Sequence, residues 1–253
     1  MRNIMGALIE HKERVLQDYT EDQLLGVFLY GSQNYGISTE NSDVDTKAIL
    51  IPTVQDLVLG KPISREIHLE NGEHCEVKDI REFIRMFEKQ SINFIEVLFT
   101  DYCLINRKYN RIWREYFINN REEIAHMNER YTIITVCGQA IRTLKQNKTD
   151  GKKFANGLRL YRFLEKYLAG ANYSEAIDVS LGDTELAKKL IDYKRGLITV
   201  DEKETDKLID KFSHLLETVD NYDKTPNPRV VEILREGALA LVTNEQNEFD
   251  FYK

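Results

Sequence analysis

The sequence predicts an α+β protein in which a small mixed sheet with helices comes first and an all-helical unit follows. Short apolar runs rich in β-forming residues, which are typical of buried strands, occur in the first part of the chain. From about residue 106 onward the apolar residues recur at helical spacing instead. We therefore expect two domains, residues 1–105 and residues 106–253, with the boundary within residues 101–108.

The first domain is predicted to open with an amphipathic helix, Ile4–Leu16, whose apolar residues share one face. Val27–Tyr30 and Thr46–Ile51 are short apolar runs that end at Gly31 and Pro52. Glycine and proline interrupt regular structure, so both runs are bounded as strands usually are. We expect two buried strands here.

A β-hairpin is predicted between Arg65 and Asp79. Asn71-Gly72 separates two extended stretches, and this dipeptide favours a tight turn because both positions tolerate positive φ. Asp79 can cap a following helix through its side chain. That helix, beginning at Ile80, has its apolar residues on one face and is expected to cover the sheet.

Helical periodicity recurs through the second domain. The predicted helices are Tyr131–Gln146, Lys152–Ala169, Thr184–Tyr193, Lys203–Val219 and Pro228–Val242. The last residues, Asn244–Lys253, are predicted to be a polar tail.

The composition indicates a globular protein. Hydrophobic residues make up 42% and aromatic residues 10% of the 253 residues, which is enough for a packed core. No apolar run approaches the roughly 18 residues of a membrane helix, and the first residues lack the apolar stretch of a secretory signal. We therefore expect a soluble, cytoplasmic protein with no membrane partner.

The cysteines and the net charge limit the classes of site and function that the sequence allows. Cys75, Cys103 and Cys137 show no C-x-x-C spacing, so neither a disulfide framework nor a zinc site is indicated. Cys75 and Cys137 are interpreted as small core residues. The net charge of −7 argues against a generally basic surface that coats nucleic acid. It leaves room for a local cationic groove beside an acidic, metal-filled site.

The segment Leu29–Asp45 is the most informative about function. A strand that ends in Gly31-Ser32 exposes backbone N–H groups, and glycine lets a triphosphate approach closely. Asp43 and Asp45, separated by one residue on a strand, project to the same face and can share divalent cations. Phosphoryl transfer needs mainly charge neutralisation and in-line positioning, which two metals supply. An ordinary polar loop is the alternative, since Asp and Ser are common turn formers.

This pattern resembles the active-site signature of the polymerase-beta-like nucleotidyltransferases: an apolar residue, Gly, Gly or Ser, a gap, then Asp-x-Asp or Asp-x-Glu. The gap here is the ten residues Gln33–Ser42. The resemblance implies that Asp43 and Asp45 are catalytic and bind Mg²⁺ or Mn²⁺. It also implies a third metal-binding and catalytic carboxylate on a nearby strand, and Glu76 occupies that position. Many members of that superfamily have Asp there.

A closer similarity is to predicted nucleotidyltransferases associated with RNA-repair operons, and it covers most of the chain. Glu76–Phe83 and Asn93–Phe99 carry it, the second where those proteins have an Asn-Pro-x-x-x-Glu helix. Phe94 replaces the proline. The similarity implies an NTP substrate, with ATP expected, and an RNA 3′ end as the acceptor.

The same proteins show a Lys, then His-x-x-Arg-Leu, then a Gly at the helix end in their helical half. The matching residues here are Lys152 or Lys153, Asn156, Arg159-Leu160 and Gly170. Asn156 stands where His is usual.

Helical spacing places Lys152, Asn156 and Arg159 on one face of the predicted helix Lys152–Ala169. Arg recognises phosphate through two hydrogen bonds and Lys adds a point charge, so Lys152 and Arg159 are expected to bind the triphosphate. A solvated cationic helix face is the open alternative.

Several other side chains near these motifs have two interpretations. Lys47 shares the carboxylate face with Asp45 and is expected either to touch phosphate or to pair with an aspartate. His74 shares a face with Glu76 and is interpreted as a surface residue. One helical segment carries aromatic residues that could stack a base, but core packing is the preferred interpretation. These aromatic residues are Tyr109, Trp113 and Tyr116.

The sequence therefore predicts a metal-dependent nucleotidyltransferase that transfers a nucleoside monophosphate from an NTP to an acceptor hydroxyl and releases pyrophosphate. Asp43, Asp45 and Glu76 would be catalytic, and Gly31 and Ser32 would hold phosphates. A protein hydroxyl or an antibiotic-type small molecule is compatible as the acceptor. A non-catalytic nucleotide-binding interaction module is the alternative from another class. The paired aspartates favour catalysis, because binding alone does not need a paired metal site. The oligomeric state is left open.

Overall fold

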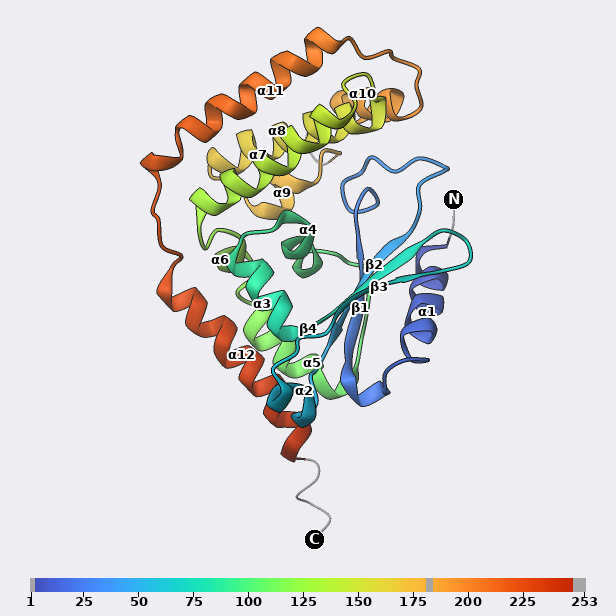
Figure 1. Ribbon diagram of the computed structural model, residues 1–253, viewed down its shortest axis with the longest axis vertical. Coiled ribbons are helices and arrows are strands. Elements are labelled where there is room, and N and C mark those ends of the chain that lie inside the picture. The colour runs from blue at the N-terminus through green and yellow to red at the C-terminus, as the bar shows by residue number, and fades with distance from the viewer. Residues whose placement is uncertain (1–2, 181–183, 248–253) are drawn as a thin grey trace.

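The computed structural model describes residues 3–180 and 184–247 and has an α+β fold (Figure 1). In this part of the chain one sheet has the strand order β3-β4-β2-β1-β5. The strands are β1 (Leu24–Tyr30), β2 (Asp45–Leu50), β3 (Ser64–His68), β4 (His74–Asp79) and β5 (Cys103–Ile105). β2 and β4 are parallel and the other neighbours are antiparallel, so the sheet is mixed, as the sequence predicts.

Helices form the rest of the regular structure. In chain order they are α1 (Ile4–Val15), α2 (Val54–Leu59), α3 (Ile80–Glu88), α4 (Ile92–Ile95), α5 (Arg107–Ile112), α6 (Arg121–Ala125), α7 (Glu129–Gln146), α8 (Gly151–Leu168), α9 (Tyr173–Ile177), α10 (Thr184–Lys194), α11 (Glu202–Glu217) and α12 (Pro228–Asn247). Short 3₁₀ turns lie at Glu21–Gln23, Glu96–Leu98 and Val219–Asn221, and Trp113–Ile118 is a π-helix.

Every stretch with a predicted periodic face is a helix in the structure, with somewhat different ends. α12 continues to Asn247, into the predicted polar tail, and residues 248–253 of that tail lie outside the described residues. The pattern does not predict α2, α4, α6 and α9. These helices have only four to six residues, too few to show periodicity.

The sheet is covered on both faces, because alternate residues of its strands point to opposite sides. Val27 and Leu50 pack beneath α1, in a cluster with Val15 of that helix. Phe28 and Ile49 pack on the other side, in the main core that includes α3 (Figure 1). The side chain of Asp79 accepts hydrogen bonds from the first turn of α3, so the predicted cap is confirmed.

The hairpin is confirmed, but its turn is not the two-residue turn that the sequence predicts. The amide of Gly72 donates to the carbonyl of Leu69 at 3.1 Å, and the amide of Leu69 donates to the carbonyl of Glu73 at 2.9 Å. Gly72 alone takes positive φ in this turn, at 88°. The loop is longer because the side chain of Asn71 bonds the backbone and side chain of Glu73.

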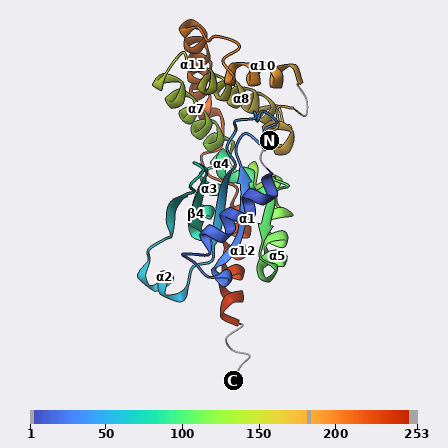
Figure 2. The ribbon, with the colours of Figure 1, turned by 90° about the vertical axis from the view of Figure 1, so that its right-hand side faces the viewer.

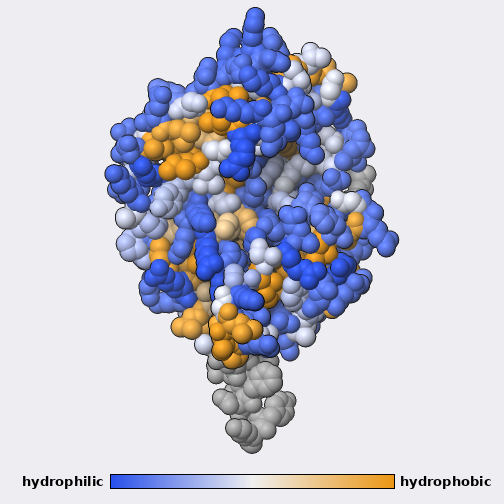
Figure 3. All heavy atoms as spheres, in the orientation of Figure 1, coloured by the Kyte–Doolittle hydropathy of each residue, from blue (hydrophilic) through white to orange (hydrophobic). Residues whose placement is uncertain are grey.

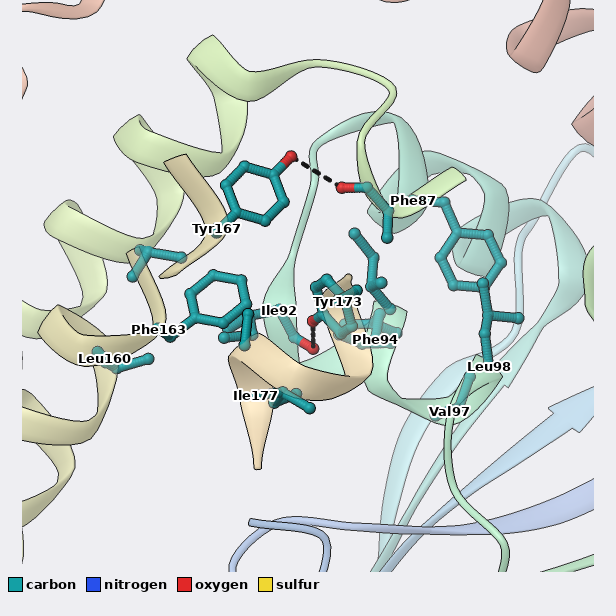
Figure 4. Close-up of a cluster of buried hydrophobic side chains, with 14 of the residues drawn as sticks. Phe87, Ile92, Phe94, Val97, Leu98, Leu160, Phe163, Tyr167, Tyr173 and Ile177 are labelled. Atoms are coloured by element: carbon teal, nitrogen blue, oxygen red, sulfur yellow. Dashed lines mark hydrogen bonds between the residues drawn. The ribbon is translucent and has the colours of Figure 1, made fainter. Parts of the chain in front are cut away.

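The helical half lies beyond one end of the sheet (Figure 2). A cluster of aromatic and aliphatic residues fills the junction, and Figure 4 shows two tyrosines that anchor it. The Tyr173 hydroxyl donates to the carbonyl of Ile92 at 3.3 Å, and the Tyr167 hydroxyl donates to the carbonyl of Ala125 at 3.0 Å. Buried hydroxyls of this kind fix the relative position of the segments they join.

The last helix, α12, returns from the helical half and packs against α3, α5 and the π-helix Trp113–Ile118 (Figure 1). The division between residues 105 and 106 stays a prediction. β5, just before that division, pairs with β1. Tyr109 and Trp113 are buried, so core packing is confirmed for these two aromatic residues.

The three cysteines are free thiols, and Cys75 and Cys137 are buried as predicted. Figure 3 shows a mostly hydrophilic face with an apolar patch at its lower end, where α2 exposes Val54, Val58 and Leu59. Within the described ranges, no helix combines the length and apolar character that crossing a membrane requires.

Candidate functional site

A cleft of about 240 Å³ lies where the end of the sheet meets α7, α8 and α10. Its volume is slightly below the roughly 300–1,000 Å³ of typical small-molecule pockets. The first half of the chain contributes Tyr30, Gly31, Ser32, Tyr35, Ile37, Ser42, Asp43, Asp45 and Asn93. The helical half contributes Gln139, Lys152, Asn156, Arg159 and Lys194.

The turn after β1 begins at Gly31, which has φ of 94°. This conformation requires glycine, since other residues are strained there. The amide of Gly31 donates to both carboxylate oxygens of Glu96, at 3.3 and 3.4 Å. The N–H of Gly31 therefore bonds Glu96, which differs from the exposed N–H that the sequence predicts. Ser32 lines the cleft, and its carbonyl accepts from the amides of Tyr35 and Ile37.

Glu96 is a buried carboxylate behind the glycine turn that the sequence pattern does not single out. Its side chain is only 1% exposed. Burial raises the pKa of Glu96 to about 7, although the hydrogen bond from Tyr35 and the charges of Arg159 and Lys47 lower it. Glu96 lies in the segment Asn93–Phe99, and its burial behind Gly31 follows from the tertiary fold.

Asp43 and Asp45 both line the cleft, although Asp43 precedes β2 and is not on a strand with Asp45 as the sequence predicts. Asp45 is the first residue of β2, and its Oδ1 lies 2.8 Å from Nδ1 of His74. Nε2 of His74 in turn lies 2.7 Å from the hydroxyl of Tyr30. Burial raises the pKa of Asp45; His74 lowers it, and the negative charge of Asp43 raises it. His74 is therefore a partner of the carboxylate pair rather than a plain surface residue.

Glu76 and Lys47 are placed beside the cleft and paired with each other. They are register partners across the parallel strands β4 and β2, and their side chains form an ion pair. Nζ of Lys78 lies 3.1 Å from the second oxygen of Glu76. Burial alone would raise the pKa of Glu76, but Lys47 and Lys78 outweigh it and lower that pKa. The described residues that line the cleft do not include Glu76 or Lys47.

Lys47 thus pairs with a carboxylate, one of its two expected roles, but with Glu76 and not with an aspartate. It is 1% exposed. Its Nζ also lies 4.0 Å from the ring centroids of Tyr30 and Phe94. Two aromatic faces and one carboxylate therefore stabilise this buried cation.

The helical half brings cations to the opposite wall of the cleft. Arg159 is only 2% exposed, so it lies in the packed side of α8 and not on a solvated face. Its guanidinium lies 3.8 Å from the ring centroid of Tyr35. Nε and Nη2 donate to Oδ1 of Asn156, at 3.2 and 2.9 Å. Nη1 is buried and has no hydrogen-bond partner among the described residues, which leaves a donor for a ligand.

Lys152 and Lys194 complete this wall. Lys152 is exposed and lines the cleft, whereas Lys153 is not among its described lining residues. Lys194, at the end of α10, donates to the carbonyl of Ile37 at 2.7 Å. Burial, together with the charges of Lys152 and Arg159, lowers the pKa of Lys194 to about 8. The sequence gives no signal for Lys194, because α10 reaches the cleft only through the tertiary fold.

No protein-family model matches the chain, and no curated protein matches its sequence. The class of protein is therefore inferred from the cleft. Among residues 3–180 and 184–247, no group of three or more His, Cys, Asp or Glu side chains is arranged to hold a metal ion by itself. A nucleotide-bound Mg²⁺ usually takes only one or two protein carboxylates and completes its shell with phosphate oxygens and water. Asp43 and Asp45 fit that requirement.

Proposed function

We propose that this protein is a metal-dependent nucleotidyltransferase that transfers a nucleoside monophosphate from an NTP, with ATP expected, to an acceptor hydroxyl and releases pyrophosphate. One observation carries the proposal. A single cleft has two carboxylates, Asp43 and Asp45, on one wall and three cations, Lys152, Arg159 and Lys194, in the other. A triphosphate that carries Mg²⁺ has the complementary charges, a cation toward the aspartates and anionic oxygens toward the basic side chains.

Asp43 and Asp45 would hold Mg²⁺ or Mn²⁺ together with the nucleotide. The metal would neutralise charge that develops on the phosphoryl oxygens. Glu76 was expected as the third ligand, but Lys47 and Lys78 neutralise its carboxylate. The proposal therefore assigns metal binding to the two aspartates and leaves Glu76 in its ion pairs.

The other cleft residues would bind and orient the phosphates. Nη1 of Arg159 has no partner among the described residues, and the guanidinium lies over the Tyr35 ring, so we infer that Arg159 is preorganised for phosphate recognition. Lys152 and Lys194 would add positive charge where pyrophosphate leaves. Holding the NTP in one orientation lets the acceptor hydroxyl attack in line.

The acceptor would approach beside Asp45. His74 and Tyr30 lie there, and both are polar groups that could orient a hydroxyl. We propose an RNA 3′ end as the acceptor on the strength of the family resemblance. A protein hydroxyl and a small molecule need the same chemistry, so the experiment includes them.

The test is transfer of label from each of the four α-labelled NTPs, with Mg²⁺, to separate pools of RNA, protein and small-molecule acceptors. Asp43→Asn serves as the inactive control. We expect labelled acceptor from the wild-type protein with ATP and none from the variant. Tight metal-dependent NTP binding without transfer to any pool would indicate the non-catalytic binding module. Absence of both binding and transfer would overturn the proposal.

A further inference from the structure

A histidine and a glutamate are buried together beneath the aspartate segment, on the face of the sheet covered by α1. His11 of α1 is 0% exposed and Glu73 of the hairpin is 4% exposed. Nε2 of His11 lies 3.1 Å from Oε2 of Glu73. Burial of such groups is costly unless each is hydrogen-bonded. The other hydrogen-bond partners of His11 and Glu73 therefore indicate the structural role of the pair.

The second oxygen of Glu73 accepts a hydrogen bond from the amide of Val44 at 3.2 Å. Val44 is the residue between Asp43 and Asp45, and its side chain is buried in a small core with Ala7 and Leu8 of α1. The carboxylate of Glu73 thus holds the backbone at the centre of the proposed metal-binding segment.

The pair also bonds the residue that follows Asp45. Nδ1 of His11 lies 2.7 Å from Oγ1 of Thr46. The side chain of Asn71 donates to Glu73 at 3.1 Å and accepts from the Glu73 amide at 3.0 Å, which fixes the carboxylate. Hydrogen bonds within the hairpin loop therefore hold Glu73 in place.

This anchoring matters because the sheet itself does not position Asp43. The ladder between β1 and β2 begins at the pair Tyr30 and Asp45, so Asp43 and Val44 precede it. The described hydrogen bond of the Val44 amide goes to Glu73. The relative position of the two aspartates therefore depends on a side chain from the hairpin.

We propose that Glu73, braced by His11, is a positioning residue that fixes the Asp43–Val44–Asp45 backbone and so sets the two carboxylates for metal-bound triphosphate. The inference rests on the proposed function. Catalytic and binding groups need supporting residues that hold them within a fraction of an ångström. Glu73 supplies that support from the opposite face of the sheet.

Glu73→Gln tests the inference. Glutamine has the same size, but one acceptor oxygen becomes an NH₂ group that faces other donors, so Val44, Asn71 and His11 cannot all be satisfied. The matched control is Glu70→Gln, an exposed carboxylate in the same loop. The readouts are the Kd of ATP with Mn²⁺ by calorimetry and the exchange rate of the Val44 amide hydrogen.

For Glu73→Gln we expect ATP–Mn²⁺ binding to weaken about ten- to a hundredfold, the change that loss of a hydrogen bond to a charged group produces. The Val44 amide should exchange faster by a similar factor, while Ala48 in β2 keeps its wild-type rate. Glu70→Gln should change neither readout. A lower Tm with unchanged Kd and unchanged Val44 exchange would show that the pair only stabilises the fold and would overturn the inference.

A second variant covers the case in which Glu73→Gln does not fold. Asn71→Ala removes one hydrogen bond to the Glu73 carboxylate, and Asn71 itself is exposed. We expect a severalfold weaker Kd, and a wild-type Kd would contradict the positioning role. The wild-type titration separates the two hypotheses. If wild-type protein does not bind ATP–Mn²⁺, the proposed function fails; if it binds and both variants bind equally well, only the inference on Glu73 fails.

Discussion

The guanidinium of Arg159 lies over the ring of Tyr35, 3.8 Å from its centroid. Arg159 belongs to α8 of the helical half, and Tyr35 belongs to the loop after β1. The Tyr35 side chain is also hydrogen-bonded to buried Glu96, which accepts from Gly31. A continuous set of contacts therefore joins the glycine turn to the cationic wall of the cleft.

Arg159→Ala should weaken NTP binding by about 1.5–3 kcal/mol, the scale of a hydrogen bond to a charged group. Because Arg159 is buried against Tyr35, we also expect a lower Tm. Calorimetry with ATP and Mg²⁺ measures the affinity. Arg162→Ala, on the same helix but paired with Glu165 at the surface, is the control and should bind ATP normally. Loss of stability with unchanged affinity would show that Arg159 supports the fold and does not bind the nucleotide.

Asp43→Asn and Asp45→Asn should each abolish transfer, because each removes a carboxylate from the cleft without changing side-chain volume. Burial and the charge of Asp43 raise the pKa of Asp45, so ionised Asp45 is disfavoured in the folded protein. The metal-free Asp45→Asn protein should therefore have an equal or higher Tm than wild type. Transferase assays and thermal unfolding in EDTA measure the two effects. Full activity in the double variant is incompatible with the proposed chemistry.

The pH dependence of NTP binding should report Lys194. Its pKa is lowered to about 8 by burial and by Lys152 and Arg159. A triphosphate favours the protonated lysine, so affinity should fall as pH rises from about 7 to about 9. Asp43, Asp45, Lys152 and Arg159 line the same cleft as Lys194. Lys194→Gln should bind more weakly at pH 7 and lose this trend, and a trend that survives would assign it to another group.

The stability of the ligand-free protein should rise with pH, whereas the affinity for NTP should fall. The folded-state pKa of Lys194 is below its unfolded value, so the unfolded chain binds more protons above about pH 8. Stability should therefore rise as pH increases from about 8 to about 10, and Lys194→Gln should reduce that rise. Urea unfolding at several pH values tests this. A fall in wild-type stability that is unaltered in the variant would contradict the sign.

Glu76→Gln should be mainly a stability variant. Lys47 is 1% exposed, and removing its carboxylate leaves a buried cation without its partner. Breaking a buried pair in this way costs about 3–5 kcal/mol, here somewhat less because Glu76 is partly exposed. Urea unfolding measures the loss, and Glu66→Gln, which lies opposite on β3, should change stability by less than about 0.5 kcal/mol. Lost metal binding at wild-type stability would instead make Glu76 a ligand.

Local sequence patterns predict the longer helices, the strands β1 to β4 and several of the cleft residues, because periodicity and turn chemistry are short-range properties. They cannot give strand order. β4 lies parallel to β2, and this register brings His74 beside Asp45 and Glu76 beside Lys47. The pattern also cannot show that Glu96 is buried behind Gly31 or that Lys194 reaches the cleft. Each depends on contacts between segments distant in the sequence.

α12 comes last in the chain but packs on helices of the first half, and this limits how the two halves can move relative to each other. The chain passes from the first half to the helical half before α6 and comes back in α12, which packs on α3 and α5. Two covalent crossings restrict relative rotation to the single axis that passes near both, in contrast to two domains on one linker. The spacing between the aspartates and the basic side chains can then change only by rotation about that axis, so less ordering entropy would oppose the binding of a ligand in the cleft.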